Sequence, residues 1–323
     1  MLVVGASGLI GSNVTVAATQ QSWDVLGCYH EHAVEFSGAH ALALEMADRR
    51  ACVDIAEEWE PDVVVHAAGE RSLSRFERDP YAAQLDFVGA EHTLAAARTV
   101  RARHVLVSCD LVHSGYLPPG LRFDESDLPA PVNAYGRSKL ACEEAVMRSN
   151  TRWLITRTGD VYGVNASTPL AGQPARHAWE RSGLALTLVK RLRDRAPLAA
   201  PPGMWRTPTY AWDYAQRLCE LIAQGCEGVY NMGGPDSLGR REWVELLADR
   251  FGCPPGLVRE GTVGAFLSAC GEDRHVQVPS NAALSDVKAR AAIGVAAVGP
   301  ERGVGLMREQ LLRVHVPAGV DAR

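Results

Sequence analysis

The sequence predicts an α/β fold: a Rossmann-type doubly wound parallel sheet with a smaller C-terminal substrate-binding lobe. Two observations carry this prediction. Short apolar runs alternate with helix-patterned stretches through the first 160 residues or so, as in successive strand–helix units. The first apolar run also leads directly into a glycine-rich turn and a helical pattern, which is where a dinucleotide fingerprint is expected.

The glycine turn follows a predicted strand at residues 2–4. Its spacing is Gly-x-x-Gly-x-x-Gly, and a helical pattern continues from it. Glycines allow the backbone to approach a pyrophosphate, whose charge the helix N-terminus stabilises. The predicted cofactor-binding residues of this turn are Gly5, Ser7, Gly8, Leu9, Ile10 and Gly11.

Two further strands, at residues 25–29 and 41–44, are expected to end at the adenosine side of the cofactor. Tyr29 stands where an acid would bind the 2'-hydroxyl of NAD, which favours NADP slightly, although no arginine is adjacent to hold a phosphate. The predicted contacts are Tyr29, His30, Glu45 and Met46.

The run Val63-Val-Val-His66-Ala-Ala-Gly69 has the composition of a buried parallel strand that ends in small residues. We expect Ala67, Ala68 and Gly69 to pack against the cofactor. His66 lies in an apolar context without an evident acid partner, which is typical of a core histidine. Predicted helices at 50–59 and 81–100 and a strand at 104–108 continue the alternation.

Tyr135 and Lys139 lie four residues apart at the predicted start of a helix, and therefore on one face of it. A neighbouring positive charge favours phenolate and lowers a tyrosine pKa from its ordinary value of about 10. Such a tyrosine can donate a proton to a carbonyl oxygen while a hydride reaches the carbon.

The order of these features resembles the extended short-chain dehydrogenase/reductases. Within them it is most similar to the dTDP-4-dehydrorhamnose reductase branch, which also includes the regulatory beta subunit of methionine adenosyltransferase. The matching stretches run nearly end to end. They are 5–11, 61–69, the acidic loop 123–131, Tyr135 with Lys139, 157–163, and 208–210 with Asp213.

The resemblance implies that Tyr135 donates the proton and that Lys139 holds the nicotinamide ribose and lowers the tyrosine pKa. A serine or threonine of the family, which orients the carbonyl, is replaced by Cys109, the third predicted catalytic residue. A thiol is a poor donor, so polarisation of the carbonyl should weaken. Ser108 could substitute only with a local twist, and His113 or Ser114 could contribute instead; a thiolate nucleophile at Cys109 is disfavoured because no basic activator is adjacent.

Other departures concern binding and reaction type. Asp86 stands where the family usually has asparagine, so a buried acid there needs a partner or a raised pKa. Leu111 after Asp110 disfavours a dehydratase, whose pattern is Asp-Glu. The predicted substrate-binding residues are Asp110, Trp205, Arg206 and Thr209.

The predicted cofactor domain comprises residues 1–164 with 207–235, and the substrate lobe comprises 165–206 with 236–323. The 323 residues carry a net charge of −5 without a long basic run, so nucleic acid is not an expected partner. We expect a cytoplasmic protein, because no apolar stretch could span a bilayer and the N-terminus lacks the features of a signal peptide. The eight scattered cysteines indicate reduced thiols and no metal site.

The expected function is NAD(P)H-dependent reduction of a carbonyl on a nucleotide-linked keto sugar or a related small intermediate, and a homodimer is also expected. Two alternatives stay open. One is a cofactor-binding regulatory subunit with weakened catalysis, which Cys109, Asp86 and Val278 favour. The other is a sugar-nucleotide epimerase.

Overall fold

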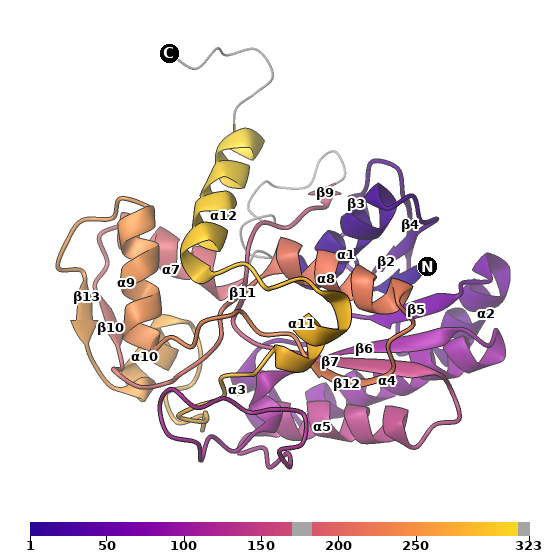
Figure 1. The fold of residues 1–323 in the computed structure, drawn as a ribbon, viewed down its shortest axis with the longest axis horizontal. Helices are drawn as coiled ribbons and strands as arrows, with labels where there is room; N and C mark the ends of the chain where they lie inside the picture. The colour runs from indigo at the N-terminus through magenta and orange to yellow at the C-terminus, as the bar shows by residue number, and fades with distance from the viewer. Residues whose placement is uncertain (170–182, 316–323) are drawn as a thin grey trace.

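A seven-stranded parallel sheet forms the centre of the molecule (Figure 1). The computed structural model describes residues 1–169 and 183–315. The strand order is β12-β7-β6-β5-β1-β2-β4, and every neighbouring pair is parallel. The strands are β1 (Leu2–Val4), β2 (Leu26–Tyr29), β4 (His40–Ala43), β5 (Val63–His66), β6 (Arg103–Cys109), β7 (Trp153–Thr158) and β12 (Gly228–Asn231).

The order of the strands reverses between β1 and β5. From β1 the chain moves outward to β2 and β4, and then returns to the other side of β1 to add β5, β6, β7 and β12. In open α/β sheets, ligands bind at the carboxyl ends of the strands beside such a reversal. The glycine turn after β1 and the small residues after β5 both lie at this point.

Helices cover both faces of the sheet. One layer contains α1 (Leu9–Gln20), α8 (Ala211–Ala223) and α11 (Val287–Ile293), which pack together over a core that includes Val14 and Leu218. The other contains α2 (Arg49–Trp59), α4 (Pro80–Thr99) and α5 (Ala134–Met147). The predicted doubly wound sheet is confirmed.

The smaller lobe lies beside the carboxyl ends of the strands, at the left of Figure 1. Its core includes Leu188, Trp243 and Phe266, all buried. It is built from α7 (Leu184–Arg193), β10 (Leu198–Ala200), α9 (Arg240–Arg250), β13 (Val258–Glu260), α10 (Val263–Ala269) and α12 (Pro300–His315), and β10 pairs with β13 in parallel.

Two short strand pairs and two short helices complete the described elements. The first of the two pairs is antiparallel and the second is parallel. β3 (Val34–Glu35) pairs with β9 (Thr168–Pro169), and β8 (Val161–Tyr162) pairs with β11 (Thr209–Tyr210). The sequence did not predict α3 (Leu73–Arg78) or the 3₁₀ helix η1 (Asp110–Val112).

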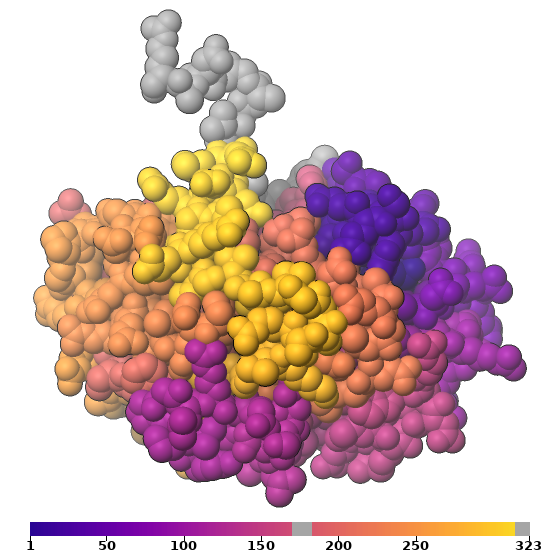
Figure 2. Space-filling view, viewed as in Figure 1, coloured from indigo at the N-terminus to yellow at the C-terminus, as the bar shows by residue number. Residues whose placement is uncertain are grey.

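A long loop between η1 and α5 rests on the segment that leads from the lobe back to α11. Phe123 forms a bridge with Leu284, and Ser280 Oγ donates to the Gly115 carbonyl at 2.9 Å. Figure 2 shows this loop in purple against the yellow-orange segment on one face. Because Ala289 and Ile293 join the core beneath α8, α11 packs with the sheet rather than with the lobe core.

Candidate functional site

The N-terminus of α5 is fixed against η1 by two features of the Asn133–Lys139 stretch. Asn133 caps the helix by accepting a hydrogen bond from Gly136 N at 2.8 Å, and its Nδ2 donates to the Gln277 carbonyl at 2.9 Å. A Cβ on Gly136 would overlap the Leu111 carbonyl oxygen. The glycine therefore allows α5 to sit close enough to η1 to bring Tyr135 to the strand end.

Tyr135 and Lys139 lie together as the sequence predicts. Lys139 Nζ is 5.7 Å from the centroid of the Tyr135 ring, which packs edge-on against Phe76 of α3 at 5.1 Å. Partial burial of the phenol raises the pKa of Tyr135, and the nearby Cys109 adds to this, although Lys139 acts to lower it. The prediction of a lowered pKa is therefore wrong in its net direction, because desolvation outweighs the ammonium.

The Lys139 ammonium has a buried carboxylate partner. Its Nζ donates to Asp86 Oδ1 at 2.8 Å, and Ser138 Oγ donates to Asp86 Oδ2 at 3.0 Å. Burial acts to lower the pKa of Lys139, but the Asp86 carboxylate and the other groups around it raise it overall. The sequence predicts that a buried acid at position 86 needs a partner or a raised pKa. The structure shows that its partner is Lys139.

Cys109 ends β6 and is buried close to Tyr135. Burial raises the pKa of its thiol, which disfavours a thiolate nucleophile. The hydroxyl of Ser108 is already engaged, since its Oγ donates to Glu143 Oε1 at 2.5 Å within the buried Glu143–Arg157 ion pair. His113 stacks on Phe123 with ring centroids 4.2 Å apart, so its ring faces the loop.

The glycine turn fits a dinucleotide pyrophosphate. Gly5 has φ +90°, and a Cβ there would lie 2.6 Å from Ala68 N, so only glycine brings the turn against the end of β5. A Cβ on Gly11 would overlap the Gly5 carbonyl. Gly8 is the N-cap of α1 and has no side chain to occupy the first N–H groups of the helix, which suits an anion. Asn165 Nδ2 donates to the Ser7 carbonyl at 2.8 Å and braces the turn.

The predicted adenosine contacts lie at the adjacent strand ends. Tyr29 ends β2, and the exposed His30 Nε2 lies 2.9 Å from Glu45 Oε2 beyond β4. The carboxylate of Glu45 is therefore present at this edge of the sheet. It follows β4, whereas the acid that binds the 2'-hydroxyl of NAD is expected at the end of β2. Met46 packs against Gly89 of α4, and its carbonyl contacts His92 Nδ1 at 3.0 Å.

The predicted substrate residues Asp110 and Arg206 contact each other in the structure. Arg206 Nε lies 3.3 Å from Asp110 Oδ2, and its two Nη atoms donate to the carbonyls of Trp205 and Pro279 at 2.8 and 3.0 Å. Burial raises the pKa of Asp110 to about 7, although Arg206 acts to lower it. Thr209 is buried and donates to the Thr207 carbonyl, whereas Trp205 is half-buried.

A second ion pair beside the first was not predicted. Arg240 of α9 lies 2.6 Å from Asp160, a residue with φ +44° that follows β7. The two pairs connect the sheet edge with the lobe. Arg240 lies 80 residues from Asp160, so no local pattern in the sequence indicates their contact.

The lobe also contacts the region beside Tyr135 through Glu272, which no motif in the sequence indicates. The carboxylate accepts hydrogen bonds from Leu73 N at 3.2 Å, from Ser74 N at 2.8 Å and from the hydroxyls of Ser72 and Ser74. Arg78 and Asp273 form an ion pair of 2.8 Å next to it. These contacts join the lobe to α3, whose Phe76 packs on Tyr135.

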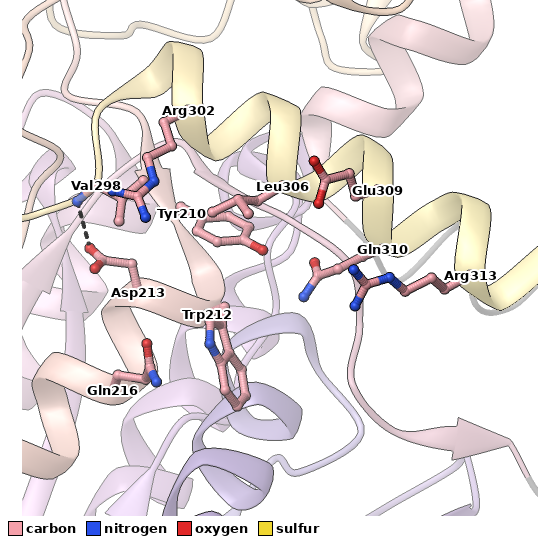
Figure 3. A pocket seen from close by; sticks show the side chains of 10 residues that line it. All are labelled: Tyr210, Trp212, Asp213, Gln216, Val298, Arg302, Leu306, Glu309, Gln310 and Arg313. Carbon is pink, nitrogen blue, oxygen red and sulfur yellow. Dashed lines mark hydrogen bonds between the residues drawn. The ribbon is translucent and has the colours of Figure 1, made fainter.

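A separate pocket of about 290 Å³ lies between the start of α8 and α12 (Figure 3). Its wall includes Tyr210, Trp212, Arg302 and Glu309, and Asp213 accepts a hydrogen bond from Val298 N at 3.1 Å. None of the residues predicted to bind cofactor or substrate lines it.

Comparison with known proteins identifies the family. The model of the RmlD substrate binding domain matches residues 1–310. This chain belongs to the RmlD substrate binding domain family. The predicted resemblance to extended short-chain dehydrogenase/reductases is thereby confirmed. Within the residues that the structure describes, the RmlD-type fold contains no helix long and apolar enough to cross a membrane.

The relatives of this RmlD-family chain carry different names. The methionine adenosyltransferase 2 subunit beta of Xenopus tropicalis is 28% identical over 80% of this chain and 74% of its own. The probable low-salt glycan biosynthesis reductase Agl14 of Haloferax volcanii is 29% identical over 81% and 83%. The structure of dTDP-4-dehydrorhamnose reductase from Bacillus anthracis, in complex with NADP, superposes with a TM-score of 0.78 at 19% identity, covering 96% of this chain and 98% of its own.

Proposed function

We propose that this protein is an NAD(P)H-dependent reductase that acts on a carbonyl of a nucleotide-linked keto sugar or a related small keto intermediate. The observation that carries the proposal is the position of Tyr135 and Lys139 on one face of α5. They stand at the carboxyl edge of the sheet, beside the end of β6 and near the Gly69 end of β5. The glycine turn after β1 lies at the same edge.

The residues that would hold the nicotinamide cofactor are the glycine turn, Ala67 to Gly69, and Lys139. A bound reduced nicotinamide would supply a hydride to the carbonyl carbon. The Tyr135 hydroxyl would donate its proton to the carbonyl oxygen, which becomes a hydroxyl, and the phenol would then be restored by a proton from solvent. Cys109 Sγ, a weak donor, would assist little at that oxygen.

For the substrate, we propose contacts from Asp110, Trp205, Arg206 and Thr209. The pairing of Arg206 with Asp110 supports a role in which the arginine fixes the carboxyl group at the strand end. The adenosine end of the cofactor would meet Tyr29, His30, Glu45 and Met46, and the slight preference for NADP stays a prediction.

The test is oxidation of NADPH or NADH by the purified protein across a panel of 4-keto sugar nucleotides. The expected result is turnover with at least one of them, and a loss of about 10²- to 10⁴-fold in kcat for Tyr135→Phe with cofactor affinity retained. Oxidation that persists in Tyr135→Phe, or none with any substrate, would contradict the proposal.

A second candidate is a cofactor-binding regulatory subunit with weakened catalysis. Three observations favour it: the name of the Xenopus relative, the thiol at Cys109, and the neutralised charge of Lys139. Nicotinamide binding without turnover, together with a stable heterologous partner in co-purification, would support it over the reductase. Cofactor that stays bound through purification would instead favour an epimerase.

The homodimer is a further expectation, and light scattering would test it.

A further inference from the structure

Asp86 and Lys139 form an ion pair that is almost completely out of contact with water. The exposed fractions of their side chains are 0% and 7%, and the two atoms in contact are 2.8 Å apart. Asp86 projects from α4 and Lys139 from α5, and both lie against Gly69, where a Cβ would overlap Asp86 Oδ1. A side chain other than glycine at position 69 would therefore force the Asp86 carboxylate to shift.

The partner of Lys139 changes what its charge does to Tyr135. An isolated ammonium would stabilise a phenolate, whereas an ammonium with a carboxylate 2.8 Å away acts on its surroundings mainly as a dipole. The Asp86 carboxylate thus opposes the effect that the Tyr-x-x-x-Lys pattern predicts.

Among the residues that the structure describes, the other groups around the phenol add no positive charge that acts on it. Cys109 and Asp110 approach from the end of β6 and η1. From α3, Glu77 accepts a hydrogen bond from Ala134 N at 2.7 Å, and Arg137 on α5 is exposed and lies 4.0 Å from that same Glu77. Of these described groups, Lys139 is the cation that acts on Tyr135, and Asp86 balances it.

We propose that Asp86 is a positioning residue that holds the Lys139 ammonium and balances its charge, so that Tyr135 stays a phenol and serves carbonyl reduction in preference to alcohol oxidation. The inference rests on the proposed reductase function. In reduction the phenol O–H bond breaks and the carbonyl oxygen gains the proton, while the reduced nicotinamide gives up a hydride. Oxidation needs the opposite: a phenolate that takes the alcohol proton, and an oxidised nicotinamide that accepts the hydride.

The experiment is an alkaline titration of tyrosinate absorbance on the protein without substrate. Subtracting the curve of Tyr135→Phe from that of the wild type isolates the Tyr135 component, and Asp86→Asn is compared with Asp86→Asn/Tyr135→Phe in the same way. Because Asp86→Asn keeps the shape and removes the negative charge, we expect the Tyr135 midpoint to fall by about one pH unit or more.

Ser138→Ala is the matched control, because it removes a hydrogen bond to the same carboxylate and changes no charge. It should leave the Tyr135 midpoint where it is in the wild type. Equal midpoints in wild type and Asp86→Asn would overturn the proposal and leave Asp86 with a packing role only.

Should Asp86→Asn not fold, Asp86→Ser replaces it in the same difference titration, because it also removes the negative charge. A Tyr135 midpoint that falls supports the proposal, and a midpoint equal to that of the wild type overturns it. Because neither titration needs turnover, failure of this inference can be told apart from failure of the reductase proposal.

Discussion

Ser108 Oγ donates to Glu143 Oε1 at 2.5 Å, so the hydroxyl that precedes Cys109 in the sequence is held by a carboxylate of α5 two turns beyond Tyr135. Glu143 is itself held by Arg157 at 2.7 Å, and the whole group is buried. Successive side chains of a strand point to opposite faces, so Ser108 and Cys109 do not share a direction. Ser108 therefore does not supply the strong hydrogen-bond donor that the Cys109 thiol lacks.

We predict that Cys109→Ser increases kcat. Loss of one donor to a developing oxyanion costs on the order of 3 kcal/mol in well-studied enzymes, so restoring it should give a gain of up to about 10²-fold. Steady-state kinetics with the substrate found in the panel would measure this. Ser108→Ala is the control: it removes one hydrogen bond to the buried Glu143–Arg157 pair, so it should lower stability without a comparable change in kcat. A Cys109→Ser enzyme no faster than wild type would contradict the prediction.

Cofactor choice should respond to Glu45, whose carboxylate lies 2.9 Å from His30 beside the predicted adenosine site. A 2'-phosphate would meet this negative charge, so Glu45→Gln should tighten NADPH binding by about threefold relative to NADH, the size of an exposed charge effect. Fluorescence titration of both cofactors would measure it. Glu57→Gln, an exposed substitution on α2, should change neither affinity; equal effects of Glu45→Gln on both cofactors would place the 2'-position elsewhere.

Glu272 should contribute measurably to the stability of the contact between lobe and sheet domain. Its carboxylate accepts four hydrogen bonds from residues 72–74, and hydrogen bonds to charged groups are worth more than neutral ones. We expect Glu272→Gln to lower the free energy of unfolding by about 1–3 kcal/mol. Urea unfolding would measure the change.

Glu260→Gln is the comparison, because Glu260 is exposed and lies 3.5 Å from Arg241 at the surface. Such surface pairs contribute about 0–1 kcal/mol. If both variants lose the same free energy of unfolding, the contact of Glu272 with α3 contributes no more to stability than a surface ion pair does.

Stability should fall in acid because of buried histidines. Burial lowers the pKa of His66 and His104 to about 3 and of His113 to about 4, whereas the unfolded value is about 6.5. Below pH 6.5 the unfolded chain binds more protons at these sites, so their contribution is complete above that pH and is lost as the pH falls toward 3. Asp110 acts in the opposite direction, since its pKa of about 7 lets the folded state hold a proton below that pH.

Burial also raises the pKa of Asp213, so three histidines oppose two aspartates, and we expect a net loss between pH 6.5 and 4. Urea unfolding at several pH values would show it, and His104→Gln should reduce the slope. His275→Asn, at an exposed position, should not change it. A free energy of unfolding that stays level over this range would contradict the prediction.

The sequence by itself determined the doubly wound sheet, the glycine turn and the Tyr135–Lys139 face, because each depends on neighbours within one turn of helix or one strand. The position of the strands followed from apolar runs, and most predicted ends lie within one or two residues of the observed ones. The short α3 was missed, since six residues are too few for a helical period to be evident.

Only the tertiary structure decided what surrounds those residues. Asp86 reaches Lys139 across 53 positions of sequence, Glu272 reaches Ser74 across 198, and Arg206 reaches Asp110 from another segment. Charge effects depend on distance in space and on exclusion of water, neither of which a local pattern contains. For that reason the sequence could place an acid–base pair on α5, whereas the direction of the Tyr135 pKa shift depended on how α4, β6 and the lobe pack around it.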